Sequence, residues 1–366
     1  MTAFLVFFGR GGASEIERRL DTVKIAIGAV VLARARDAGF TLYAVTNDEE
    51  AAAAFRAGGA QILSANTMPF HFGRELARIV AERKLDRVCT IGAGAGPLLT
   101  TADLVGLREE LESNEAVVIS NNYYSADLVA FAPATALGAI DLPATDNPLP
   151  RRLHQQAGLS TRQLERSAAT LLDVDTPTDA ALLGRHPACP PELRTLPAWQ
   201  DVLADRIDAL MRLVTTPDRE LLVAGRVGAP VWTFIETQTA CRVRMLAEER
   251  GMQAAGRDTS GEARSALGFL YEKVGPRDFF ARMRELCDGM LFDTRVLFAH
   301  LGWRPGAEER FASDLFMLDR IQSAPLRAFT GAARDAPMPL LLGGQTLVSG
   351  VLWTMVEAAW AGHPEL

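Results

Sequence analysis

Hydrophobic and polar positions divide the chain into two parts with different patterns. In the first part, short apolar runs alternate with helical segments, and the run over residues 4–8 is continuous enough for a strand covered on both faces. The predicted strands cover residues 4–8, 41–46, 61–63, 87–91, 116–120 and 127–131. The predicted helices between them cover residues 22–38, 49–57, 73–84 and 101–113. Strands that alternate with helices predict a mainly parallel sheet in an α/β domain.

The second part shows helical patterns and little else. From Trp199 to Val214, apolar residues recur at helical spacing, with aspartates and arginines on the other faces. Further helices are predicted over residues 262–273, 277–288, 308–324 and 348–361, and one that starts near Pro230 and ends before Gly251. We therefore predict an α/β domain over residues 1–185, a linker over residues 186–198 and an α-helical domain of unknown role over residues 199–366.

Composition narrows the class of protein. The 366 residues are 48% hydrophobic and 23% charged, which is ordinary for a globular protein in water. The net charge of −7 argues against nucleic acid as a main partner. The four cysteines have the spacing of neither a zinc site nor a disulfide framework. With no signal peptide and no apolar run long enough for a membrane span, we expect a cytoplasmic protein with no membrane partner.

Four short motifs then point to a family. They are the opening strand with its glycine-rich loop (residues 6–12, VFFGRGG), a strand that ends in residues 46–48 (TND), the segment at residues 97–104 (PLLTTADL), and residues 171–179 (LLDVDTPTD). In this order they make residues 1–185 resemble the nucleotide-diphospho-sugar transferase superfamily, with molybdenum-cofactor and 2-phospholactate guanylyltransferases as the nearest in kind. The resemblance implies a glycosyltransferase-A-type, Rossmann-like domain that binds a nucleotide. It does not extend to the second half of the chain.

The resemblance places the nucleotide phosphates on the first loop. Glycines let the backbone approach a ligand, and successive N–H groups form an anion-binding nest. The residues that fit this role are Gly9, Arg10, Gly11, Gly12 and, further along, Arg19. Glu17 departs from the pattern, because it stands where a lysine is usual and its carboxylate would repel a triphosphate. A plain surface loop is the alternative interpretation.

The turn after the strand at residues 87–91 lacks the acid that the resemblance implies. A divalent cation beside a triphosphate needs hard oxygen ligands, and the metal-binding aspartate would fall among Ala93, Gly94 and Ala95. Mg²⁺ would therefore be weakly held. A small-residue turn at the carboxyl end of a strand still lets a ligand come close, so Gly94 is a candidate binding residue. The alternative is drift at a site that is no longer used.

Further polar residues follow the ends of the predicted strands. We expect the following to line the same cleft: Asn47, Asp48, Asn122, Ser125, Asp127, Asp146 and Asn147. Local turn chemistry explains Asn-Asn and Asp-Asn-Pro sequences equally well.

Asp173 and Asp175 are the remaining candidates for a metal ligand. The alternative is helix capping, in which Asp175 or Thr176 precedes Pro177 and Asp179 lies in the first turn. In the second half, Arg242 and Arg244 are expected on one helix, either as an anion-binding or inter-domain face or as a solvated one.

Two functions remain open at this stage. One is a nucleotidyltransferase-like protein that binds a nucleotide or other small phosphate-bearing ligand and has reduced or lost metal-dependent transfer chemistry. The other is an active nucleotidyl- or sugar-nucleotide transferase whose divalent metal is held by Asp173 or Asp175. A homodimer through the helical domain is a candidate assembly. The residue patterns identify no catalytic residue.

Overall fold

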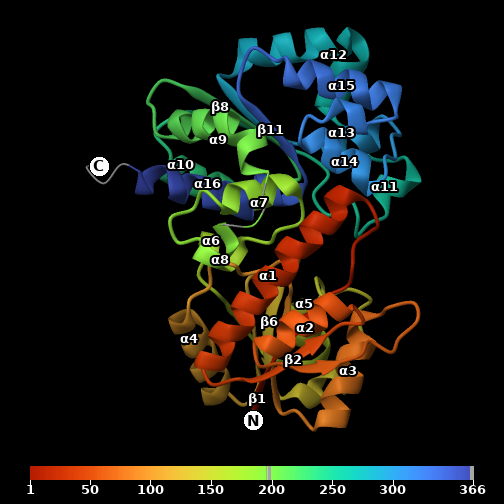
Figure 1. The fold of residues 1–366 in the computed structure, drawn as a ribbon, viewed down its shortest axis with the longest axis vertical. Helices are drawn as coiled ribbons and strands as arrows, with labels where there is room; N and C mark the ends of the chain where they lie inside the picture. Colours follow the sequence, from red (N-terminus) through yellow and green to blue (C-terminus); the bar gives the residue numbers. More distant parts are fainter. Residues whose placement is uncertain (195, 197–198, 363–366) are drawn as a thin grey trace. The chain divides into compact units, whose positions relative to one another are not determined.

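Two sheets organise the protein, each within its own unit (Figure 1). The computed structural model describes residues 1–194, 196 and 199–362. The first unit comprises Met1–Gly11 and Asp21–Asp173, and the second comprises Gly12–Leu20 and Val174–Leu366. The chain therefore changes unit inside helix α1 (Glu15–Asp37), whose first turns belong to the second unit.

The first unit contains a seven-stranded sheet with the order β3-β2-β1-β4-β6-β5-β7. Its strands are β1 (Thr2–Phe7), β2 (Thr41–Val45), β3 (Gln61–Leu63), β4 (Arg87–Gly92), β5 (Val117–Ser120), β6 (Leu128–Ala132) and β7 (Ser160–Gln163). Only β6 runs antiparallel to its neighbours β4 and β5. The mainly parallel α/β domain predicted from the alternating pattern is confirmed.

Helices connect these strands. They are α1, α2 (Glu49–Ala57), α3 (Phe72–Arg83), α4 (Thr101–Ser113), the 3₁₀ helix η1 (Ala134–Ala139), α5 (Leu149–Ala157) and α6 (Ala168–Leu171). Local chemistry fixes where several begin: Asp48 accepts the amide of Ala51 to cap α2, and Thr100 and Asp103 form a reciprocal capping box at α4.

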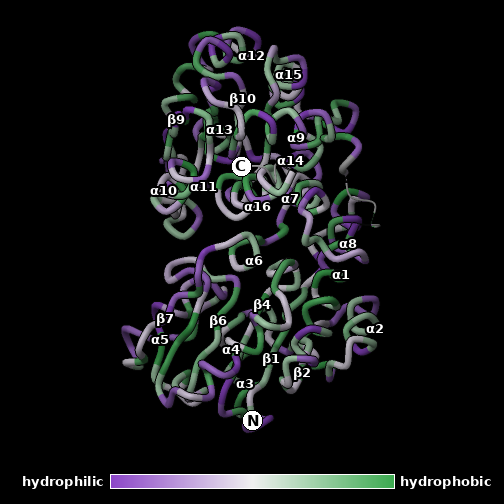
Figure 2. The backbone as a smooth tube through the Cα atoms, turned by 90° about the vertical axis from the view of Figure 1, so that its left-hand side faces the viewer, coloured by the Kyte–Doolittle hydropathy of each residue, from purple (hydrophilic) through white to green (hydrophobic). Residues whose placement is uncertain are grey.

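The strands are apolar because both faces of the sheet are covered. Phe4, Leu5 and Val6 of β1 have no exposed surface, and Figure 2 shows β1 and β6 as largely green, apolar segments. On one face, Leu5 packs in a cluster with Leu76 and Ile79 of α3. Each fully buried side chain of this kind contributes about 1.5–3 kcal/mol, so the core fixes the strand ends that carry the loops.

The second unit corrects the all-helical prediction. It contains a four-stranded, wholly parallel sheet with the order β11-β10-β8-β9. Its strands are β8 (Glu220–Gly225), β9 (Arg242–Ala247), β10 (Gly289–Asp293) and β11 (Leu340–Gly343). Its helices are α7 (Pro177–Leu183), α8 (Pro191–Arg194), α9 (Gln200–Val214), α10 (Ala229–Gln238), α11 (Arg257–Ser260), α12 (Ala266–Leu286), α13 (Thr294–His300), α14 (Ala307–Asp314), η2 (Leu318–Arg320), α15 (Ala324–Arg334), η3 (Gln345–Val348) and α16 (Gly350–Ala361).

The connection between the predicted domains is packed where the structure describes it. Of the predicted linker, residues 195, 197 and 198 lie outside the described residues. His186 and Cys189 are buried, and residues 174–185, expected in the first domain, belong to the second unit. Among the residues that the structure describes, none of the helices combines the length and apolar character needed to cross a bilayer.

Candidate functional site

The order of the first sheet reverses between β1 and β4. From β1 the chain adds β2 and β3 on one side and then β4 on the other. Phe7 and Gly92 are paired at the carboxyl ends of these two strands, and the amide of Ala93 donates to the carbonyl of Phe7 at 3.0 Å. Open α/β sheets bind ligands in the crevice at such a reversal, outside the carboxyl ends of the strands. The two glycine-rich segments therefore leave the sheet side by side at this reversal of strand order.

Open space lies over one glycine of each segment. A Cβ added to Gly9 or to Gly92 would meet no heavy atom within 4 Å. Gly96 differs, because its φ of +67° and its contact with Leu99 serve the turn itself. Gly9 and Gly92 are thus the places where a ligand can approach the backbone closely.

The turn that lacks an acid is used for packing. Ala93, Gly94 and Ala95 are buried, and a Cβ built on Gly28 of α1 would lie 3.3 Å from the Cβ of Ala93. A carboxylate in this turn would be forced against α1 and desolvated. Close approach of α1 is a physical reason for the small residues found here.

Arg10 is held by two acids. Its Nε donates to Asp48 Oδ2 at 2.6 Å and its Nη2 to Glu50 Oε2 at 3.1 Å. The hydrogen bond from Arg10 holds the pKa of Asp48 below its usual range and, with that to Glu50, raises the pKa of Arg10. The structure therefore brings Arg10 and Asp48 together, as an ion pair.

The remaining residues of the predicted phosphate loop engage acids of the chain itself. The amide of Gly11 donates to both carboxylate oxygens of Asp21, at 3.3 and 3.2 Å. A Cβ on Gly12 would collide with the carboxylate of Glu17, which accepts the Ser14 hydroxyl at 2.7 Å.

The predicted phosphate-binding residues fall in different units, because Gly9, Arg10 and Gly11 belong to the first unit and Arg19 does not. It belongs to the second unit, where it pairs with Glu15 at 2.7 Å, and the same glutamate pairs with Arg320 at 2.7 Å. Asn47 is placed at the end of β2, and its side-chain amide pairs with both backbone groups of Ala65 at 2.9 and 3.0 Å.

Polar residues predicted for the site in the β5–β6 connection contact those predicted just before α5. Asn122 accepts the amides of Tyr124 and Ser125 in a local turn, at 3.1 and 3.3 Å. The Ser125 hydroxyl donates to Asn147 Oδ1 at 2.8 Å, and the Asn147 amide donates to Asp146 at 2.9 Å. Four of the predicted residues are thus joined in one network, through contacts that turn chemistry also explains.

Asn121 is the better anchored neighbour that the sequence prediction missed. It is buried, accepts the amides of Asp127 and Leu128 at 3.1 and 3.2 Å, and donates to the carbonyl of Thr170 at 3.0 Å. Its only sequence signal was its position directly after the apolar residues of β5. Asp127 contacts Asn121 through its side chain at 3.3 Å, and its carbonyl accepts the Gly92 amide at 3.4 Å.

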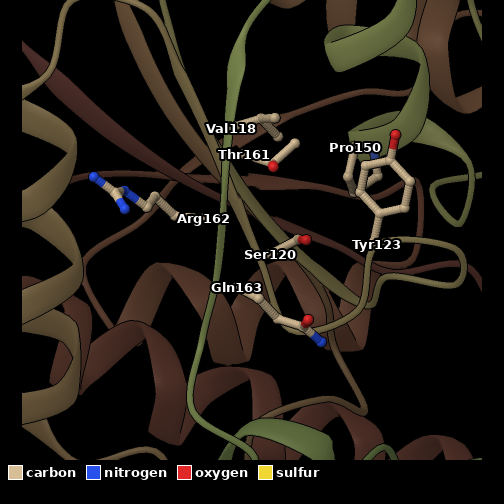
Figure 3. A pocket seen from close by; sticks show the side chains of 7 residues that line it. All are labelled: Val118, Ser120, Tyr123, Pro150, Thr161, Arg162 and Gln163. Carbon is tan, nitrogen blue, oxygen red and sulfur yellow. The ribbon is translucent and has the colours of Figure 1, made fainter.

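A pocket lies beside strands β5 and β7 (Figure 3). Its lining residues are Val118, Ser120, Tyr123, Pro150, Thr161, Arg162 and Gln163. Ser120 and Thr161 point to the side on which Tyr123 stands, and Arg162 points the opposite way. The pocket is two strands away from the reversal between β1 and β4, because β6 and β5 follow β4 in the sheet.

The two candidate metal ligands, Asp173 and Asp175, belong to different units. Asp173 closes the first unit, where it pairs with Ala95 in an isolated antiparallel bridge, whereas Asp175 is exposed and belongs to the second unit. Thr176 caps α7 in a capping box with Asp179, which confirms the capping interpretation for this segment. Over residues 1–194, 196 and 199–362, no group of three or more His, Cys, Asp or Glu side chains is arranged to hold a metal ion. The donor set near the turn does not fit Mg²⁺.

Arg242 and Arg244 lie on strand β9, so their placement on a helix was wrong. Arg242 pairs with Asp218 at 2.9 Å, and Arg244 pairs with Glu220 of β8 at 3.3 Å. The apolar residues Val243 and Met245 alternate with these arginines, which is the period of a strand.

The chain matches no family model and no curated protein. Among solved structures it is similar to a "putative nucleotide-diphospho-sugar transferase" from Desulfovibrio desulfuricans G20, at 15% identity and a TM-score of 0.40, over 58% of this chain and 96% of that one. It is also similar to a cytidylyltransferase from Leptospira borgpetersenii serovar Hardjo-bovis (14% identity, TM-score 0.40, 50% and 85% covered). A third is a CMP:2-keto-3-deoxy-manno-octonic acid synthetase complexed with CTP, at 14% identity and a TM-score of 0.36, over 48% of this chain and 94% of that one. Likeness at this level assigns no activity to the chain.

Proposed function

We propose that the first unit binds a nucleotide or another small phosphate-bearing molecule at the crevice between β1 and β4, without metal-dependent transfer chemistry. The observation that carries the proposal is the pair of open glycines, Gly9 and Gly92, at the carboxyl ends of two adjacent parallel strands. Glycines let a ligand approach the backbone closely, and a phosphate needs several N–H donors at close range. The first loop would supply these donors, because the Gly92 amide already donates to the carbonyl of Asp127 at 3.4 Å.

The charges at this edge fit a role in binding better than one in transfer. Arg10 is the cation of the first loop, and because it is paired with both Asp48 and Glu50, a phosphate would compete with these carboxylates for it. The turn of residues 92–96 supplies no carboxylate, so a cation that bridges ligand and protein would lack its hard ligands there. Positioning by backbone and arginine is the chemistry that these residues can perform.

The first test is ligand-dependent stabilisation of the whole chain. Thermal unfolding is measured with ATP, GTP, CTP and a uridine diphosphate sugar, each in EDTA and in Mg²⁺. A ligand at 100 times its Kd stabilises the folded state by about 2.7 kcal/mol. We expect at least one nucleotide to raise the Tm in EDTA and Mg²⁺ alike.

A matched pair of variants locates the site. Gly92→Val puts a side chain into the open space over the crevice, at a strand position that accepts valine. Gly138→Val puts the same side chain into open space in η1, which follows β6 at the opposite edge of the sheet. We expect Gly92→Val to abolish the ligand-induced shift and Gly138→Val to keep it. If no nucleotide shifts the wild type, or if Gly92→Val binds normally, the proposal is wrong.

The runner-up is an active nucleotidyl- or sugar-nucleotide transferase with a divalent metal at Asp173 or Asp175. The bridge between Ala95 and Asp173 favours it, since this pairing brings an acid next to the acid-free turn. Stabilisation that requires Mg²⁺ and disappears in EDTA would support this function over the first. We also propose that the protein acts in the cytoplasm. We further propose that the second unit forms a homodimer, and sedimentation of the full chain tests this assembly.

A further inference from the structure

Asp21 lies directly under the loop proposed to hold phosphate. It projects from α1 with only 4% of its surface exposed. Both of its carboxylate oxygens face the amide of Gly11, at 3.3 and 3.2 Å. A Cβ on Gly11 would lie 3.4 Å from Oδ1, in ordinary van der Waals contact, so the carboxylate lies directly against this part of the loop.

A carboxylate on a loop amide occupies the position that a phosphate oxygen would take. Each backbone N–H makes one strong hydrogen bond, and the bond is strongest to an anionic oxygen. Gly11 therefore cannot serve Asp21 and a ligand phosphate at full strength at the same time. Repulsion between the two anions opposes any arrangement in which both stay close to the loop.

The surroundings of Asp21 make protonation of its carboxylate easier than in water. The groups that act on it electrostatically are Arg10, Lys24 and Asp48, two cations and one anion. Burial is the largest influence and raises the pKa of Asp21, ahead of the hydrogen bond from Gly11, which lowers it. An arriving phosphate adds negative charge and raises the pKa further.

We infer that Asp21 is an internal anion that occupies the Gly11 amide in the free protein and competes with the ligand's phosphate for it. This inference rests on the proposed function. On binding, the phosphate takes the Gly11 N–H, and Asp21 loses that bond and takes up a proton. The expected ligand is therefore one that carries a phosphate, and its binding tightens as the pH falls.

The experiment compares Asp21→Asn with Asp37→Asn in the full chain. The first replaces the carboxylate by an amide whose oxygen still accepts the Gly11 bond. The second removes one negative charge at the far end of the same helix, where Asp37 pairs with Arg36 on the surface. Calorimetric titration with inorganic pyrophosphate and with the nucleotide found above is run in EDTA between pH 5 and 8.

We expect Asp21→Asn to bind both probes about tenfold more tightly than the wild type at pH 8, since a like charge beside the ligand is removed. The variant should also lose most of the wild type's tightening at low pH. Asp37→Asn should match the wild type in both respects. Circular dichroism and the Tm of each variant establish that it is folded.

Two results would overturn the inference in different ways. If the wild type binds and Asp21→Asn binds equally or more weakly, Asp21 supports the loop and does not compete, while the proposed function stands. If neither folded protein binds pyrophosphate or any nucleotide, the proposed function fails and the inference fails with it.

Discussion

Asp173 pairs through its backbone with Ala95, in an antiparallel bridge that joins the end of the first unit to the turn after β4. Directly opposed residues of such a bridge have their Cβ atoms about 4.5–5.5 Å apart and on the same face. The only acid in this pair thus faces an alanine. The bridge thus places one carboxylate opposite the acid-free turn after β4.

Adding a second acid opposite Asp173 should create a response to metal. Ala95→Asp places two carboxylates on one face of the bridge, one of them at a buried position. In EDTA we expect the free energy of unfolding to fall by about 2 kcal/mol, because a desolvated carboxylate lies beside another. Millimolar Mg²⁺ should recover at least half of that loss, as measured by thermal unfolding.

Ala95→Asn is the control for the substitution of Ala95. It adds a side chain of the same shape without charge, so it should lose stability but not respond to Mg²⁺. A Tm of Ala95→Asp that is the same in EDTA and Mg²⁺ would show that Asp173 does not face this position closely enough to share a cation.

Strands β1 to β6 and helices α1 to α4 could be predicted because local pattern and final environment agree there, whereas α5, β7 and α6 were not predicted. The run at residues 4–8 is apolar because β1 is covered on both faces. In the second unit, Thr176 with Asp179 carries the sequence of a capping box and forms one. Gly275 and Pro276 interrupt α12, with φ +76° at Gly275, where the sequence predicted two separate helices.

The strands of the second unit were missed for a physical reason. Strand β10 is entirely buried and only five residues long, and the predicted helix over residues 277–288 runs directly up to it. Short apolar runs of this kind suit a buried strand and a buried helix equally, so periodicity alone cannot separate them.

The contacts of the candidate site could not be predicted from the sequence either. That Asp21 reaches Gly11, across ten positions, depends on where α1 begins and on how the loop turns, which no local pattern specifies. Asn121 and Asn122 are adjacent and chemically identical, yet only Asn121 is buried.

Asn121 and Asn122 should differ sharply in their contribution to stability. Asn121→Ala leaves the amides of Asp127 and Leu128 and the carbonyl of Thr170 without their buried partner. We expect a loss of about 2–3 kcal/mol, since each unsatisfied buried group costs about 1–3 kcal/mol and some relaxation occurs. Asn122→Ala removes only a local turn contact and should cost under about 1 kcal/mol. Urea unfolding of both variants measures the difference, and equal losses would contradict the network described here.

Asp179 should make stability depend on pH. It has no exposed surface, its Oδ2 accepts the amides of Thr176 and Asp175 and the hydroxyl of Thr346, and its Oδ1 has no hydrogen-bond partner. Burial raises its pKa from 3.8 to about 7. Between these values the folded state binds more protons than the unfolded state, so this group lowers the free energy of unfolding as the pH rises from about 4 to about 7.

Asp179→Asn should remove that contribution, whose slope is at most about 1.4 kcal/mol per pH unit for one proton. Asp103→Asn is the matched control, because it changes the same capping-box position in the exposed first turn of α4. Urea unfolding at several values from pH 4 to 8 checks this. If Asp179→Asn keeps the pH dependence of the wild type, another group is responsible for it.

Gly225 should be among the least replaceable residues of the second unit. Its φ is +130°, and a Cβ there would collide with Asp293, which has no exposed surface and binds Arg226 through two hydrogen bonds of 2.6 and 3.0 Å. Gly225→Ala should therefore strain the backbone and push apart a buried ion pair at the ends of β8 and β10. We expect a loss of about 3 kcal/mol or more in the free energy of unfolding, measured in urea. Gly306→Ala, at an exposed helix start where a Cβ meets nothing within 4 Å, should change it by less than about 0.5 kcal/mol. Similar small losses in the two variants would mean that Asp293 and Arg226 can move aside, and that the carboxyl end of β8 is less tightly packed than the distances indicate.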